Sequence, residues 1–290
     1  MRVLRKIKNN NNAVAGIVVA IMIVGLVIAI ISILQTVYVP KWMEERESEH
    51  MEKVAEQFSQ LKFALDSISV TEQSIPITTP ITLGSKELGF LMSTRAFGAL
   101  SIQPEKLVIL TEDGTGNEEE IWLDTIKYSS ENAYYLDQTF VYEGGATILS
   151  QNQGNVMIAE PSFTVTGSTY LNISMHVVNI VTVGGKTSIG GYGTYSIKTE
   201  YLNTSASTIN GSDNYLKNLT IETGYPLLWY KFINSTFSKL GLSFGSNPSI
   251  NDYYMTSNDE KTTIYFYLVN AYFNIKVTDI NVQIGPGWVE

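Results

Sequence analysis

The chain has 290 residues and no cysteine, and its 28 acidic residues exceed its 19 basic residues, so the formal net charge is −9. This length accommodates one large domain or two small ones, each with a sizeable core. The lack of cysteine excludes disulfides, thiolate metal sites and thiol nucleophiles, and the acidic balance argues against nucleic-acid binding.

An uncharged apolar run near the N-terminus is the first feature in chain order. It is 22 residues long with Ser32 as its only polar residue, and at 1.5 Å per residue a helix of this length measures roughly 33 Å, close to the hydrocarbon thickness of a bilayer. We predict a transmembrane helix over residues 13–35, with membrane lipid as its partner. A cleaved secretory signal is the alternative, although such signals have shorter apolar regions. The run begins at Ala13 and ends at Leu34, and its small residues include Gly16, Ala20 and Gly25.

The flanking charges predict the orientation of this helix. Residues 1–12 contain four basic residues and no acidic one, whereas residues 41–53 contain five glutamates and three basic residues. Positive flanks stay in the cytoplasm. We therefore expect a cytoplasmic leader over residues 1–12 and a C-terminal domain outside the cell. The chain after this leader has a net charge of −13, because all 28 acidic residues and 15 of the basic ones lie there.

The next stretch predicts a stalk helix over residues 36–69, with Pro40 as a site where it can kink. The segment Glu44 to Glu52 is almost wholly charged and is expected to be solvated. Beyond it, apolar residues recur at alternating steps of three and four, which predicts one packed face. We expect this face to pack on the chain's own domain, with packing on neighbouring copies as the alternative. Its residues are Met51, Val54, Phe58, Leu61, Leu65 and Ile68.

The pattern changes to β from residue 70 onward, where short runs rich in Val, Ile, Thr, Tyr and Phe alternate with turn residues. Without a regular alternation of strands and helices, an antiparallel sandwich or jelly-roll-like arrangement is favoured, so the fold class is mainly β over residues 70–290. The predicted strands are residues 74–83, 88–91, 106–111, 121–128, 139–142, 146–149, 155–158, 162–166, 171–183, 193–202, 219–223, 262–268 and 272–284.

One later helix is predicted from Tyr225 to Leu240. Pro226 suits the first helical turn, and Gly241 suits the position after the C-terminus.

Residues that carry chemistry are sparse. The two histidines, His50 and His176, offer neither a histidine-rich metal site nor a catalytic triad with spare candidates, and we interpret them as surface or packed side chains. The acidic stretch Glu112 to Glu120 has oxygen ligands around glycines, which is compatible with calcium, but it lacks the EF-hand spacing and is better interpreted as a solvated loop. No cofactor or metal is expected, and the chain is not expected to be an enzyme.

Five N-x-S/T sequons lie in the second half of the predicted external domain, which is typical of exposure outside the cell. The candidate glycosylation sites are Asn172, Asn203, Asn210, Asn218 and Asn234.

A resemblance to known proteins lies mainly in the stalk. The stretch TVYVPKWMEERESEHMEKVAEQFSQLKFAL, with Val39-Pro40, Trp42, Glu47 and His50, and the region from Tyr134-Tyr135 to Ala146 with its Val141-Tyr142-Glu143, are similar to archaeal proteins with pilin-like N-termini. Together with the basic leader and the apolar helix, they resemble archaeal pilin- and archaellin-like surface proteins. The resemblance implies removal of the leader by a prepilin peptidase and packing of the apolar helix in a filament core. This chain departs from the pattern at Asn9 to Asn12, where basic residues and a small residue usually precede the cut.

Three function classes follow. The first is a pilin-like structural subunit of the cell surface, whose partners are other copies of itself or pilin-like subunits. The second is a monomeric membrane-anchored ectodomain that binds a surface partner or a glycan. The third, with the weakest support, is an ectoenzyme that uses paired carboxylates, for which no spaced motif is present.

Overall fold

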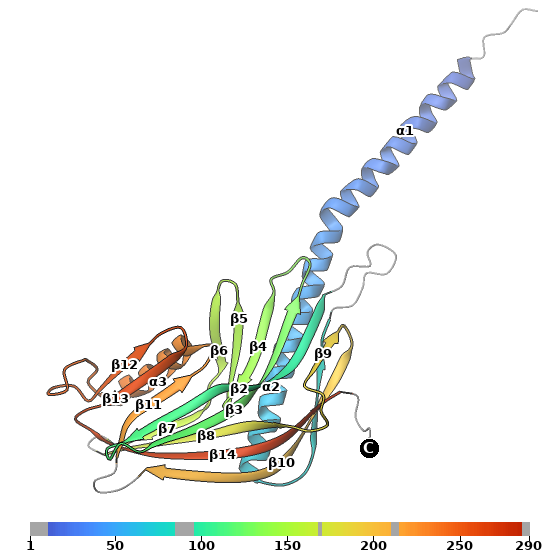
Figure 1. Cartoon of the computed structure of the whole chain (residues 1–290). Coiled ribbons are helices and arrows are strands. Elements are labelled where there is room, and N and C mark those ends of the chain that lie inside the picture. Colours follow the sequence, from blue (N-terminus) through green and yellow to red (C-terminus); the bar gives the residue numbers. More distant parts are fainter. Residues whose placement is uncertain (1–10, 85–95, 168–169, 210–214, 286–290) are drawn as a thin grey trace, which may run out of the picture.

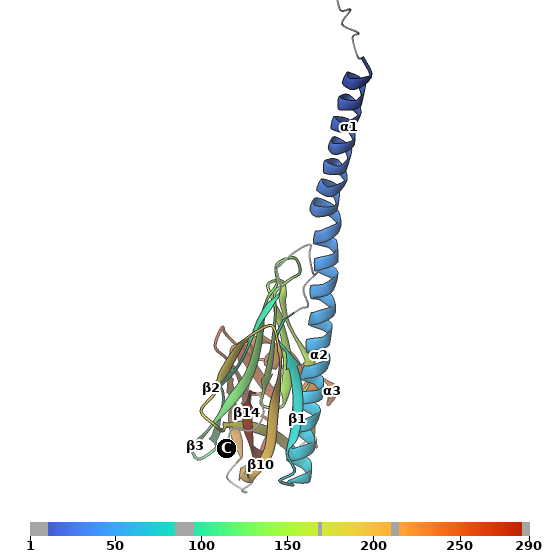
Figure 2. The same ribbon diagram turned by 90° about the vertical axis from the view of Figure 1, so that its right-hand side faces the viewer.

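The structure, a computed structural model, describes residues 11–84, 96–167, 170–209 and 215–285. A long N-terminal helix projects from a β domain and continues along one side of it (Figure 1). The view turned by 90° shows the far half of the helix standing clear of the domain (Figure 2). The sequence prediction of a mainly β fold after a long apolar helix is confirmed.

The projecting helix is continuous through three assigned segments, α1 (Asn11–Ile33), the π-helical turn η1 (Leu34–Tyr38) and α2 (Val39–Thr71). Pro40 has no N–H to donate, and its ring collides with a carbonyl of the preceding turn, so a regular α-turn cannot pass through it. The wider π-turn relieves this conflict, and the N–H of Val39 donates to the carbonyl of Leu34. Pro40 therefore widens one turn without ending the helix.

The helix ends two residues after the predicted stalk. Glu72 adopts a left-handed conformation with φ of 52°, and its N–H donates to the Ile68 carbonyl at 2.9 Å. This closure satisfies a carbonyl of the last helical turn.

A single 14-stranded sheet follows, in the order β1-β10-β14-β11-β2-β3-β4-β5-β6, with β7, β8, β9, β12 and β13 paired beside this path. The strands are β1 (Ile77–Thr82), β2 (Phe97–Asp113), β3 (Glu118–Glu131), β4 (Gln138–Glu143), β5 (Ala146–Gln151), β6 (Gly154–Ala159), β7 (Ser162–Thr166), β8 (Tyr170–Thr182), β9 (Ser188–Gly191), β10 (Thr194–Ile209), β11 (Leu216–Glu222), β12 (Tyr253–Ser257), β13 (Lys261–Phe266) and β14 (Asn270–Ile284).

The sheet is antiparallel with one exception among the described strands. β8 and β14 run parallel, in a register that begins at Tyr170 with Asn270 and continues to Thr182 with Val282. Parallel neighbours need a long crossover, which the chain supplies through β9 to β13.

Two large hydrophobic cores lie within this sheet, with a small third cluster of Val141, Ile148 and Leu228 among the described residues. The stalk core joins α2 to strands β1 to β4, β8, β10 and β14, and the α3 core joins α3 (Pro226–Lys239) to the other ends of β2 and β3 and to β7, β8 and β11 to β14. β2 serves both, because Leu100 lies in the stalk core and Ile109 in the α3 core. A register shift between Gln103 and Leu107 separates these two halves of β2.

The later helix is confirmed close to its predicted limits. α3 begins at Pro226, and Gly241 follows its end with φ of 75°, a conformation that glycine adopts without strain. Its buried side chains, including Trp229, Ile233 and Phe237, recur every four residues.

The strand boundaries differ from prediction mainly at long strands. β2 begins at Phe97, before the predicted limit, and its added residues include Leu100 and Ile102 of the stalk core. β10 ends at Ile209, because it continues past polar residues that pair without contributing to a core. The short strands β9 and β12 were missed. The predicted strand over residues 88–91 lies outside the described residues.

Candidate functional site: the apolar helix and its seat in the β domain

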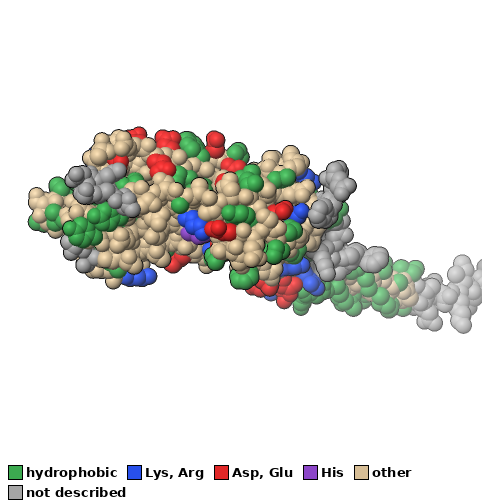
Figure 3. Space-filling view, turned by 90° about the horizontal axis from the view of Figure 1, so that it is seen from below, with side chains coloured by type: hydrophobic (Ala, Val, Ile, Leu, Met, Phe, Trp, Pro, Cys, Tyr) green, Lys and Arg blue, Asp and Glu red, His purple; other side chains and the backbone are tan. Residues whose placement is uncertain are grey.

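α1 exposes an apolar surface along its whole described length. Every side chain from Ala15 to Tyr38 is exposed, and burial begins at Val39. The helix has a mean hydropathy of 3.3 over its most apolar 18 residues and is long and apolar enough to cross a membrane. The domain surface in Figure 3 instead intersperses polar and charged atoms with apolar ones. A contiguous apolar surface of this size indicates contact with lipid or with another protein.

The small residues of α1 lie on open surface. Gly16, Ala20, Gly25 and Leu34 are all exposed, and a Cβ added at either glycine would contact nothing within 4 Å. The side chain of Ala13 is outside the described set. These small residues leave room for the backbone of another helix to approach closely.

The apolar face of α2 is covered by the chain's own domain. Met51, Val54, Phe58, Leu61, Leu65 and Ile68 are each at most 2% exposed. Phe58 packs on Phe140, with ring centroids 5.5 Å apart, and on Tyr128 at 6.4 Å. Because these side chains form one wall of the stalk core, this face is not accessible to a neighbouring copy in this structure.

A buried carboxylate fixes the end of α2 nearest α1. Glu47 is fully buried, and its carboxylate accepts backbone N–H groups from Ala133 at 3.0 Å and from Tyr134 and Tyr135 at 2.7 Å. Hydrogen bonds from three donors offset the cost of burying the charge. The expectation that residues 44–52 are solvated is therefore wrong for Glu47, since it lies four residues before Met51 on the packed face.

Two further polar side chains of α2 bind strand β1. Nε2 of His50 lies 3.0 Å from the Thr82 carbonyl oxygen, and Gln57 accepts the Thr82 N–H at 2.9 Å while donating to the Thr82 hydroxyl at 3.1 Å. Burial lowers the pKa of His50, and its Nδ1 has no hydrogen-bond partner among the described residues. His50 is therefore a packed, neutral side chain near pH 7.

A second buried carboxylate joins β4 to α3. Glu143 is 1% exposed and accepts the indole N–H of Trp229 at 2.7 Å and the hydroxyl of Thr223 at 2.9 Å. Burial raises the pKa of Glu143 to about 7, because desolvation outweighs these hydrogen bonds. Near neutral pH the group therefore carries a proton in a large fraction of molecules.

Comparison with protein families gives one match. A family of unknown function, DUF7289, matches residues 12–243. The chain belongs to this family. The matched range includes α1, α2 and α3 but ends before β12, so the central strand β14 of the DUF7289 chain lies outside it. No curated protein and no solved structure matches the chain.

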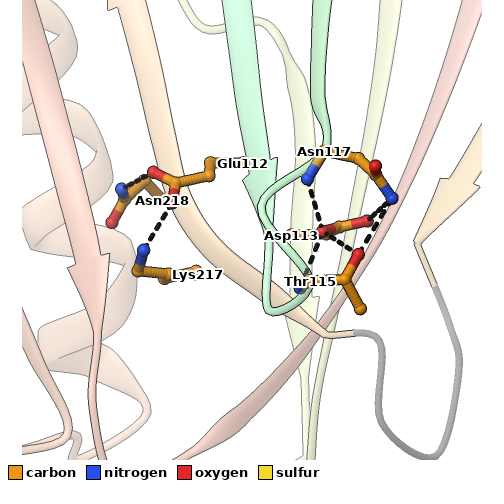
Figure 4. Close-up of polar contacts among 6 residues, drawn as sticks. All are labelled: Glu112, Asp113, Thr115, Asn117, Lys217 and Asn218. Carbon is orange, nitrogen blue, oxygen red and sulfur yellow. Dashed lines mark hydrogen bonds and ion pairs between the residues drawn. The ribbon is translucent and has the colours of Figure 1, made fainter.

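The acidic loop of this DUF7289 member is a closed hairpin turn between β2 and β3 (Figure 4). The carboxylate of Asp113 accepts the N–H and hydroxyl of Thr115, at 2.9 and 2.7 Å, and the N–H and side-chain amide of Asn117, at 2.9 and 3.0 Å. These bonds, the Thr115 hydroxyl first, hold the pKa of Asp113 well below its ordinary value. Both carboxylate oxygens are thus occupied by hydrogen donors, and no group of three acidic or histidine residues among the described residues is placed to hold a metal.

Next to this turn, Glu112 pairs with residues of strand β11. Its carboxylate accepts from Nζ of Lys217 and from the side-chain amide of Asn218 (Figure 4). The predicted solvated loop is therefore better described as a structured turn flanked by an ion pair.

The other histidine and the sequons are dispersed over the domain. His176 is half-buried in β8, with Nε2 3.0 Å from the Thr278 hydroxyl. Asn172 and Asn203 are exposed, whereas Asn218 and Asn234 are half-buried and hydrogen-bonded, the latter to the Tyr253 hydroxyl at 2.9 Å. Asn210 lies outside the described residues.

Glu47 and Glu143 were named from the sequence only as parts of the stretches that resemble other proteins, and neither carboxylate was predicted to be buried. Glu47 continues the three-and-four spacing of the packed face, which is the one signal that was available. For Glu143 the partners lie 80 and 86 residues later in the chain, so only the fold brings them together.

Proposed function

We propose that this chain is a pilin-like structural protein of the cell surface, anchored or assembled through α1. The observation that carries the proposal is the rigid continuity of an exposed apolar helix with a helix seated in a domain core. Such a rod transmits the position of the anchor directly to the β domain. The basic N-terminus lies in the cytoplasm and the β domain lies outside the cell.

Aromatic residues at the base of α1 support this placement. Tyr38 and Trp42 are 48% and 41% exposed, and their ring centroids are 6.1 Å apart. Tyr and Trp concentrate at membrane–water interfaces, where an amphipathic ring contacts both lipid and headgroups. Their position just after the apolar run fits a membrane–water interface, which in this proposal is the outer one.

The proposed partners are lipid and other copies of the chain or pilin-like subunits, and nucleic acid is not among them. Because α2 is already covered by its own domain, subunits meet through α1, where small residues permit close helix packing. The contact face includes Gly16 and Ala20, which lie one turn apart. The role is structural, and no catalytic step is assigned to the chain.

A pair of substitutions tests assembly. Gly16→Ile together with Ala20→Ile widens the contact face while leaving α1 apolar, so extracellular polymer is lost and membrane insertion persists. Val18→Ile together with Met22→Ile changes another face of the same helix and serves as the matched control. Cells are sheared, and the released and membrane fractions are blotted. Wild-type protein found only in the membrane fraction contradicts the filament.

A second candidate function is a monomeric anchored ectodomain that binds a surface partner or glycan. The observation that favours it is the covered face of α2, which leaves α1 as the only helix with an open apolar face among the described residues. In this case both double variants behave as the wild type in the shearing experiment.

A protease experiment on intact cells tests the orientation that both candidates share. External protease removes a C-terminal tag from cells if the β domain is outside. A tag that is cleaved only after the membrane is permeabilised contradicts this orientation.

A further inference from the structure

A pocket opens beside the first turn of α3. Its volume is about 390 Å³, within the range of small-molecule sites. Three segments form its walls: the β5–β6 hairpin at Gly154 and Asn155, the start of α3, and the turn between β12 and β13. The lining residues on which the argument depends are Asn155, Tyr225, Leu228, Lys231, Asn258 and Asp259.

Hydrogen bonds fix the start of α3 to β4 and to the segment from the β12–β13 turn to β13. The Thr223 hydroxyl donates to Glu143 and accepts the Tyr225 N–H at 3.2 Å, which ties the start of α3 to β4. The Thr262 hydroxyl donates to the Pro226 carbonyl at 2.7 Å, and the Thr223 N–H donates to the Glu260 carbonyl at 2.9 Å. Two of the three walls are thus held in place by the fold, and Glu143 supports one of them through Thr223.

The lining combines hydrogen-bonding groups of both kinds with an apolar floor. Lys231 and Asp259 carry opposite charges, and neither forms an ion pair among the described residues. Asn258 uses its side-chain oxygen to accept the N–H groups of Glu260 and Lys261, so only its NH₂ group is available to a ligand. Leu228 is 9% exposed and Tyr225 is half-buried, and together they supply an apolar surface.

This combination selects against a simple ion. A phosphate or sulfate would meet Asp259 as well as Lys231, and like charges repel at close range. A metal ion would find one carboxylate and an ammonium group. Sugar hydroxyls, in contrast, both donate and accept hydrogen bonds, and the C–H faces of a pyranose pack on apolar and aromatic side chains.

We propose that this pocket binds a neutral saccharide of one or two residues. The Asp259 carboxylate accepts hydrogen bonds from the sugar hydroxyls, and the Asn155 amide both donates and accepts. Lys231 donates to ring or hydroxyl oxygens. Tyr225 and Leu228 contact the C–H face of the sugar. The site does not depend on whether the chain assembles through α1.

Saturation-transfer difference NMR on the full chain tests the proposal. The chain is kept in micelles of a dimethylamine oxide detergent, since detergents with sugar headgroups would compete for the pocket. The probes are glucose, galactose, mannose, N-acetylglucosamine and maltose, with inorganic phosphate followed in parallel by phosphorus NMR. We expect saturation transfer to at least one saccharide, strongest at its C–H face.

Two variants localise the binding. Asn155→Ala and Asp259→Ala each remove a ligand-contacting group from an exposed position and weaken binding roughly tenfold, the effect of losing one good hydrogen bond. Asn152→Ala and Glu260→Ala lie in the same two segments but do not line the pocket, and they leave binding unchanged. The proposal is overturned if no saccharide in the panel receives saturation, if the control variants weaken binding equally, or if phosphate binds and the saccharides do not.

Discussion

At the level of single residues, the two buried carboxylates differ in the hydrogen-bond donors that surround them. Glu47 accepts three backbone N–H groups. Glu143 accepts from one indole and one hydroxyl, and there the cost of desolvation dominates. The first carboxylate therefore holds the backbone of residues 133–135 against α2, and the second is a proton-sensitive group near neutral pH.

The first prediction concerns the anchoring of Glu47. Glu47→Gln replaces one carboxylate oxygen by an NH₂ group that faces backbone donors, so at least one buried N–H loses its acceptor. We expect a loss of about 1 to 3 kcal/mol in the free energy of unfolding. Glu45→Gln on the exposed side of the same turn is the control and has little effect. The measurement is urea unfolding of the full chain in micelles, and equal effects of the two variants would mean that the Glu47 contacts contribute nothing.

The second prediction concerns the pH dependence that Glu143 produces. Its pKa is about 7 in the folded chain and 4.5 ordinarily, so between these values the folded state keeps a proton that the unfolded chain has lost. The free energy of unfolding therefore falls as pH rises through this window, by about 3 kcal/mol, and levels off above it. Glu143→Gln, which is neutral throughout, lacks this contribution. Unfolding is measured below, within and above the window, with Glu160→Gln as the exposed control; parallel pH curves for Glu143→Gln and the wild type would refute the assignment.

At the level of elements, α2 acts as an internal wall of the domain. Burial on α2 begins at Val39, directly after the π-turn, and includes Glu47, and the packed face continues to Ile68. The helix is exposed on its other side, where Phe63 is 74% accessible. Phe58 is buried and Phe63 is exposed on the same helix, so the two phenylalanines are a matched pair for substitution.

The third prediction uses that pair. Phe58→Ala leaves a cavity between Tyr128 and Phe140, and Leu61→Ala leaves one beside it, so each should lower the free energy of unfolding by about 2 to 5 kcal/mol. Phe63→Ala on the solvent side has a much smaller effect, as do Ser48→Ala and Glu49→Ala. Thermal or urea unfolding monitored by near-ultraviolet circular dichroism gives the comparison. Equal and small losses at Phe58 and Phe63 would show that the packed face is not buried in solution.

The elements differ in how far local sequence predicts them. The three-and-four spacing from Met51 to Ile68 is sufficient to locate the packed face, and Pro226 with Gly241 brackets α3, because both signals depend on residues close in the chain. The parallel pairing of β8 with β14 joins residues 100 positions apart, as in Tyr170 with Asn270. Each strand alone shows only alternation, which is the same for parallel and antiparallel partners, so this pairing is decided by tertiary packing.

At the scale of the whole molecule, the β domain and α1 expose surfaces of different polarity. The β domain carries the acidic excess and exposes polar and charged groups, whereas α1 exposes apolar side chains from Ala15 to Leu34. The two surfaces meet at η1 within a few residues. A molecule of this kind is stable only where water and an apolar phase lie side by side, or where α1 is covered by other helices.

The last prediction tests which phase surrounds α1. Ile23 lies near the middle of the apolar run and is 56% exposed, and Ile23→Lys places a charge there at a cost to membrane insertion of about 2.5 to 3.5 kcal/mol. If lipid surrounds α1, the wild type stays in the membrane after carbonate extraction, and the lysine variant moves in large part to the soluble or aggregated fraction. Ile23→Leu keeps the residue apolar and behaves as the wild type. Because the substitution lies far from both cores, the β domain should unfold identically in all three chains. Release of the wild type by carbonate would instead mean that α1 is covered by protein, and the anchor would have to be sought in an assembly of helices.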